Sequence, residues 1–141
     1  MIARTALVAC AAVAVLVACS RHDAASAPSQ APGSSSDGGA LYSQHCSSCH
    51  QPNGSGMREV FPPLAGDPAT VGNARDAIAA VALGSHGRIV VGGTAYDGIM
   101  PGWSADLNDE QIASIVTFVR SAWHNHAPPV SAADVAAVSG H

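Results

Sequence analysis

Five consecutive residues, Cys46-Ser47-Ser48-Cys49-His50, constrain this chain more than any other feature of its sequence. The spacing C-x-x-C-H is the attachment signature of a c-type haem. Two thiols three positions apart can each add to one vinyl group of the same porphyrin, and the imidazole that follows can ligate the iron. The motif therefore predicts one covalent haem c on Cys46 and Cys49, with His50 as an axial ligand.

Other uses of a cysteine pair fit this sequence less well. A zinc site needs a second pair of Cys or His ligands at short spacing, and none follows here. A thioredoxin-like C-x-x-C comes after a strand in a βαβ pattern, whereas the residues before Cys46 are typical of a helix. A disulfide across two residues would gain little from loop closure.

A second candidate ligand lies fifty positions further on, in Met100-Pro101-Gly102-Trp103. Haem iron held by His and Met is the arrangement of cytochromes c. A lone Met is usually a core residue, but Pro101 fixes a turn and favours an extended backbone at Met100. Together with the upstream motif, this predicts Met100 as the second axial ligand.

The N-terminal residues have the pattern of an export signal. A short basic region with Arg4 precedes an apolar run from Ala6 to Cys19, which is shorter than the roughly 20 residues of a membrane span. The segment Leu16-Val17-Ala18-Cys19 resembles the lipobox of bacterial lipoproteins. That resemblance implies a signal peptide over 1–18 and a lipidated Cys19; the alternative is cleavage that leaves a soluble periplasmic protein.

Residues 19–36 contain no large apolar side chain and predict a flexible, lipid-anchored linker. Residues 37–141 are expected to form one all-α domain of about three main helices. Candidate helix caps are Asp37, Asn73 and Asn108. The last main helix should run from Asp109 to about Trp123, with an apolar stripe packed on the first helix.

Smaller elements are predicted around these helices. Ile89–Val91 and Thr94–Tyr96 flank Gly92-Gly93 and predict a short hairpin that braces the Met100 loop. A last short helix, docked loosely, is expected to start near Ser131. His45 is expected to be an exposed helical residue.

The turn Phe61-Pro62-Pro63-Leu64 has two interpretations. A proline carbonyl here could accept the second ring N–H of His50 and fix its ligating tautomer, while Leu64 packs on the ring. The turn could equally be a rigid loop without such a role. The residues alone leave both interpretations open.

The stretch from about Gly39 to Asn125 resembles class I mono-haem cytochromes c. The shared pattern consists of Gly39-x-x-Tyr42-x-x-x-Cys46-x-x-Cys49-His50, Pro62-x-Leu64, Met100-Pro101 and the amphipathic C-terminal helix. The resemblance implies the cytochrome c fold around the haem and axial ligation by His50 and Met100. It also implies that the Pro62 carbonyl accepts from His50 and that Leu64 contacts the haem.

The tail from Phe118 to Asn125 is similar to the cytochrome domains of membrane-bound quinoprotein alcohol dehydrogenases. Related domains are fused to nitrite reductases and terminal oxidase subunits. The dehydrogenase subunits carry three haem domains, whereas this chain has one C-x-x-C-H. That departure favours a single-haem carrier.

His/Met ligation fills both axial positions, which predicts a periplasmic one-electron carrier without catalysis of its own. The alternatives are an electron-accepting subunit of a membrane-bound dehydrogenase complex, or a haem sensor or enzyme if Met100 does not ligate. From Cys19 onward the chain has five Arg, no Lys and ten acidic residues. We therefore expect a dehydrogenase, reductase or terminal oxidase that offers a basic or apolar patch, and no nucleic acid.

Overall fold

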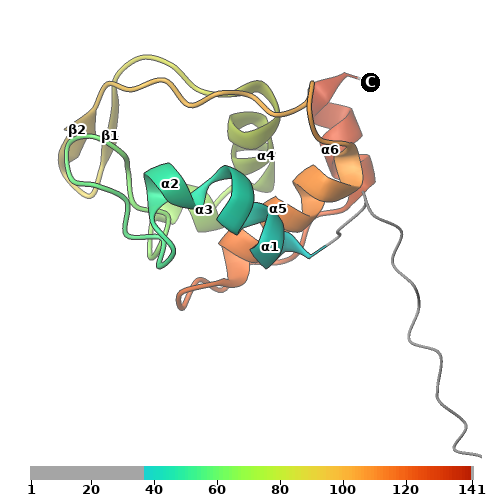
Figure 1. The fold of residues 1–141 in the computed structure, drawn as a ribbon, viewed down its shortest axis with the longest axis horizontal. Coiled ribbons are helices and arrows are strands. Elements are labelled where there is room, and N and C mark those ends of the chain that lie inside the picture. Colours follow the sequence, from blue (N-terminus) through green and yellow to red (C-terminus); the bar gives the residue numbers. More distant parts are fainter. Residues whose placement is uncertain (1–36, 141) are drawn as a thin grey trace, which may run out of the picture.

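The computed structural model describes residues 37–140, so the predicted signal peptide, Cys19 and most of the linker lie outside the described residues. The domain is mostly helical, with one small antiparallel sheet (Figure 1). Its elements in chain order are α1 (Gly38–His45), α2 (Ser47–His50), α3 (Pro68–Val71), α4 (Ala74–Leu83), β1 (Ile89–Val91), β2 (Thr94–Tyr96), α5 (Asp109–Ser121) and α6 (Ala132–Ser139). None of the helices in residues 37–140 has the length and apolar character needed to cross a membrane.

Helices α1 and α5 lie against each other (Figure 1). A side chain at Gly38 would collide with the Ser114 carbonyl of α5, so the helices approach closely at this point. The rings of Tyr42 and Phe118 are 5.4 Å apart across the contact. The predicted stripe of α5 is buried as expected; it comprises Ile112, Ile115, Val116 and Val119.

The three predicted helix caps are confirmed. Asp37 accepts hydrogen bonds from the first backbone N–H groups of α1, and Asn73 does so at α4. Asn108 and Gln111 form a reciprocal capping box at the start of α5. Helix α5 ends at Ser121, two residues earlier than expected.

The hairpin is also confirmed, with Ile89 opposite Tyr96 and Val91 opposite Thr94. Both turn glycines have positive φ, 55° at Gly92 and 79° at Gly93, as a two-residue hairpin turn requires. Tyr96 points inward and is buried.

The expectation that the last helix docks loosely was wrong. Helix α6 packs on α4 and α5, and its Val135 is fully buried. The chain leading into it is held by paired hydrogen bonds between the Thr117 side chain and the backbone of Val130, at 3.0 and 3.3 Å. The helix is therefore an integral layer of the core rather than an appendage.

Candidate functional site

A cleft of about 280 Å³ opens between the first helices and the loops that precede α5. Its lining is mainly apolar and includes Cys46, Cys49, His50 and Met100. Leu64 also lines it. The structure thus brings together, on one cavity, all the site residues predicted within residues 37–140.

Cys46 lies at the junction of α1 and α2, and Cys49 lies within α2. Both are free thiols; Cys46 is buried and Cys49 is half-buried. Burial, together with the nearby charge of Cys49, raises the pKa of the Cys46 thiol to about 11. In the protein without cofactor this thiol is therefore protonated at neutral pH.

His50 is buried at the end of α2, and its orientation is fixed by one hydrogen bond. Its ring Nδ1 lies 3.0 Å from the Pro62 carbonyl oxygen. When Nδ1 donates its proton there, Nε2 carries the lone pair that a metal needs. Burial lowers the pKa of His50, against the opposing effect of the Pro62 hydrogen bond, so the ring is neutral at pH 7.

The Pro62 turn is positioned by close backbone packing. Gly56 has φ of 62°, and a Cβ at this position would lie 2.5 Å from the Pro62 oxygen. The Gly56 N–H donates to the His50 carbonyl at 2.9 Å. The turn thus lies in contact with the imidazole, and the role of the Pro62 carbonyl in fixing the ligating tautomer stays a prediction.

Asn125 is a residue that sequence analysis did not identify, although it closes the same loop from the other side. Its side chain is 2% exposed. The amide nitrogen donates to the Leu64 and Val119 carbonyls, at 2.9 and 2.8 Å, and the amide oxygen accepts from Gly66 N at 2.8 Å. Asn125 thereby ties the turn behind His50 to the end of α5.

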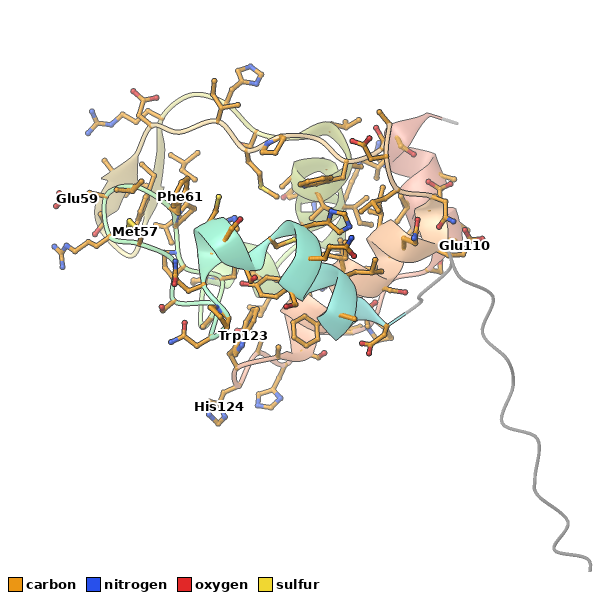
Figure 2. All side chains as sticks on the ribbon, in the orientation of Figure 1. Met57, Glu59, Phe61, Glu110, Trp123 and His124 are labelled. Carbon is orange, nitrogen blue, oxygen red and sulfur yellow. The ribbon has the colours of Figure 1, made fainter. Side chains whose placement is uncertain are left out.

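Trp123 supports the segment that follows the motif. Its indole N–H donates to the Pro52 carbonyl at 3.2 Å, and its ring stacks edge-on to Tyr42 at 5.0 Å. A Cβ at Gly54 would collide with the indole. Figure 2 shows Trp123 beneath the motif region, away from the hairpin.

Met100 is half-buried and reaches the cleft from the segment after the hairpin. Its N–H and C=O pair with Ser85, at 2.8 and 3.0 Å. The following residues continue along α4, since Trp103 N donates to the Val81 carbonyl and Ser104 N to that of Ala82, at 3.0 and 3.1 Å. The backbone hydrogen bonds of Met100 thus run to Ser85, whereas the hairpin was expected to brace it.

Gly84 makes this approach of backbone to backbone possible. It has φ of 82°, and a Cβ here would lie 2.6 Å from the Met100 oxygen. Within the Met100 segment itself, a Cβ at Gly102 would lie 2.6 Å from the carbonyl carbon of Leu83, the last residue of α4. The two glycines allow the Met100 segment to lie directly on the C-terminus of α4.

The expectation that His45 is exposed was wrong. It is half-buried, and its ring lies 4.8 Å from that of Trp103, edge to face. The contact joins the residue before the motif to the segment carrying Met100. Adjacent aromatic pairs of this kind stabilise by about 0.5–1.5 kcal/mol.

These donors fit a covalently bound haem c. The two thiols suit attachment at vinyl groups, the imidazole has a fixed tautomer, and a soft thioether lines the same apolar cleft. The individual ligand roles of His50 and Met100 remain predictions.

A family model described as Cytochrome c matches residues 35–123. Cytochrome c-552 of Thermus thermophilus is 40% identical over 91 residues, which cover 62% of this chain and 68% of that protein. The alcohol dehydrogenase (quinone) cytochrome c subunit of Gluconacetobacter polyoxogenes is 39% identical over 101 residues, 70% of this chain. The gluconate 2-dehydrogenase cytochrome c subunit of Pantoea cypripedii is 32% identical over 107 residues, 74% of this chain.

The lengths of these relatives differ from that of the chain. The match covers 21% of the alcohol dehydrogenase subunit and 24% of the gluconate dehydrogenase subunit. The chain therefore spans between a fifth and a quarter of the dehydrogenase subunits it resembles.

Proposed function

The chain belongs to the cytochrome c family, and from this premise we propose that it is a periplasmic one-electron carrier with a single haem c. Cys46 and Cys49 would hold the haem, with His50 and Met100 as axial ligands. The observation that carries this proposal is the placement of both ligands on the lining of one apolar cleft. When bound, the haem supplies an iron that takes up and releases one electron.

The surrounding residues prepare the site for that exchange. The Pro62 carbonyl holds the His50 ring in one orientation and increases its basicity as a ligand. Leu64 lines the cleft and would pack on the haem. With two protein ligands in place no position is left for a substrate, so the chain would transfer electrons without catalysing a reaction.

The visible spectrum of the full chain, matured in cells that make c-type cytochromes, tests the site. We expect a reduced c-type spectrum that does not change when carbon monoxide is added. A spectrum that shifts with the gas would mean an open sixth position and would favour a haem sensor or enzyme. The absence of any haem spectrum would contradict the proposal that Cys46 and Cys49 hold a haem.

A second candidate function is that of an electron-accepting cytochrome in a membrane-bound dehydrogenase complex. It is supported by two of the relatives, the alcohol dehydrogenase (quinone) and gluconate 2-dehydrogenase cytochrome c subunits, which are dehydrogenase subunits by name. Affinity purification of the tagged chain from detergent-solubilised membranes separates the two. If a dehydrogenase co-purifies in a stoichiometric amount, the chain is a subunit of that complex. If the chain purifies alone, the free electron carrier is favoured.

We further propose that the chain is lipid-anchored on the periplasmic side of a bacterial membrane through Cys19, with 19–36 as the tether. The support is the lipobox-like sequence before Cys19. Labelling with a radioactive fatty acid should be lost in Cys19→Ser. Label that persists in this variant would contradict the anchor, and a wild-type protein found unlabelled in the periplasmic fraction would favour the soluble alternative.

A further inference from the structure

Arg120 is a buried cation on the lining of the haem cleft. It lies near the end of α5, and its side chain is 3% exposed. Nη1 donates to the carbonyls of Thr70 and Gly72, at 2.9 and 3.2 Å, and Nε donates to that of Pro128 at 3.3 Å. These bonds hold the guanidinium in place and use only part of its five N–H donors.

No carboxylate of the described residues neutralises this charge. Within 37–140 the only ion pair joins Arg58 to Glu59, on the surface. Burying a cation without a counter-ion is energetically unfavourable unless polar partners compensate for the lost hydration. Carbonyl oxygens compensate part of the charge of Arg120. An anion bound in the cleft beside Arg120 could compensate the rest.

The other ionisable groups that face the cleft do not serve as that anion. Besides the motif residues they are Tyr42, His45, Asp67, Asp76 and Tyr96. The Asp67 carboxylate accepts from the Ala69 and Thr70 N–H groups and from the Thr70 hydroxyl, as the cap of α3. Neither Asp67 nor Asp76 lies within ion-pair distance of Arg120.

Haem carries two propionate carboxylates, and the two N–H donors of Arg120 that remain, both on Nη2, can donate charge-assisted hydrogen bonds to a carboxylate. We propose that Arg120 pairs with one haem propionate and holds it ionised inside the protein. The inference rests on the proposed haem site and adds to it a residue that recognises the acidic side of the cofactor. It also assigns a cause to the burial of an arginine near the end of α5.

The pKa of each propionate tests the pair directly. We would grow the full chain with haem labelled with ¹³C at the propionate carboxyls and titrate the reduced protein by NMR. In the wild type, one propionate should have a pKa at least one unit below the roughly 4.3 of an ordinary side-chain carboxyl. Arg120→Gln should raise that pKa by about one to two units, and Arg120→Lys, which keeps the charge, should raise it less.

Arg75→Gln is the matched control, because Arg75 is exposed on α4 and does not line the cleft. It should leave both propionate pKa values unchanged. Two ordinary values in the wild type would overturn the inference, as would an equal effect of Arg75→Gln and Arg120→Gln. If Arg120→Gln does not mature, the wild type and Arg120→Lys still decide. A normal haem spectrum with ordinary propionates would refute this pair alone and leave the proposed function intact.

Discussion

Met100 and Met57 offer a matched pair of methionines for testing the iron ligand. Met100 lines the cleft, whereas Met57 is 47% exposed and does not. Met100→Ala removes the only cleft-lining thioether of the described residues, so the sixth position of the iron should open. We expect the reduced variant to bind carbon monoxide, detected as a spectral shift that the wild type lacks.

Met57→Ala should behave as the wild type in the same measurement, since its side chain is on the surface. Figure 2 shows Met57 beside Glu59 and Phe61, at the hairpin end of the molecule. Gas binding of equal strength by Met57→Ala, or an unchanged spectrum in Met100→Ala, would show that the assignment of the ligand is wrong.

Asn125 should matter for stability as much as a large core residue. Asn125→Ala leaves two carbonyls and one N–H without the partners they have in the native protein. We expect a loss of about 2–4 kcal/mol in the free energy of unfolding, measured by denaturant titration followed by haem absorbance. Gln44→Ala, at an exposed position of α1, should cost under about 0.5 kcal/mol. Similar losses in the two variants would argue against a stabilising role for the Asn125 hydrogen bonds.

The difference between the predicted and the missed residues is a matter of sequence distance. Cys46, Cys49 and His50 form one short motif, so spacing alone identified them. Asn125 and Arg120 act on carbonyls 48 to 61 positions away. A backbone carbonyl has no side-chain signature, so sequence could not pair these residues with their targets.

At the scale of elements, the junction between α4 and the Met100 segment can be tested with two glycines of similar φ. Gly84 has φ of 82° and Gly87 has φ of 86°, so alanine is strained at both. A Cβ meets the Met100 backbone at Gly84 and open space at Gly87. Gly84→Ala should therefore destabilise the protein more than Gly87→Ala in denaturant titration.

A Cβ at Gly84 should also displace the Met100 backbone, so that the Met100 side chain is held less firmly beside the iron. We expect reduced Gly84→Ala to take up carbon monoxide faster than Gly87→Ala in stopped-flow mixing. Equal rates would mean that the contact between Gly84 and Met100 does not position the ligand.

The capping box of α6 should give a pH-dependent contribution to stability. Hydrogen bonds from the Ser131 side chain and backbone lower the pKa of Asp134 below its ordinary value. A carboxyl group whose pKa is lowered on folding stabilises the folded state at pH values above its unfolded pKa of about 3.9. This stabilisation is lost as the pH falls through the pKa of the folded state. The stability difference between wild type and Asp134→Asn should thus be constant from about pH 7 to 5 and shrink below about pH 4.

Denaturant titration at several pH values measures this difference. Asp106→Asn is the control, because Asp106 is exposed and lies outside any helix. A difference at Asp134 that does not change down to pH 3 would contradict the charged cap.

The elements that sequence predicted well carry local signals. The caps of α1, α4 and α5 and the Gly92-Gly93 turn are set by neighbours within four residues. The tight docking of α6 and the pairing of Ser85 with Met100 were missed, because both depend on contacts between distant segments. Val135 and Val138 are the only large apolar residues of α6, and this pattern was too weak to predict burial.

At the scale of the whole molecule, an apolar rim surrounds the mouth of the cleft in a chain of net negative charge. Val60, Ile89 and Ile99 line the cleft and yet are 47%, 39% and 82% exposed. Residues 37–140 contain four Arg, no Lys and nine acidic residues. Small apolar contacts suit the transient encounters of redox proteins, so electron exchange should pass through this rim.

Electron self-exchange between oxidised and reduced copies tests the rim without an identified partner. In Ile99→Glu, each of the two copies that meet carries a negative charge on its rim. The low dielectric of the contact strengthens the repulsion between these charges. We expect the self-exchange rate, measured from NMR line widths in mixtures of the two redox states, to fall about tenfold at low salt and to recover as salt is added. Ala133→Glu adds the same charge on α6, at an exposed position outside the cleft lining. That control should change the rate less than about twofold, and an equal fall in both variants would assign the effect to net charge.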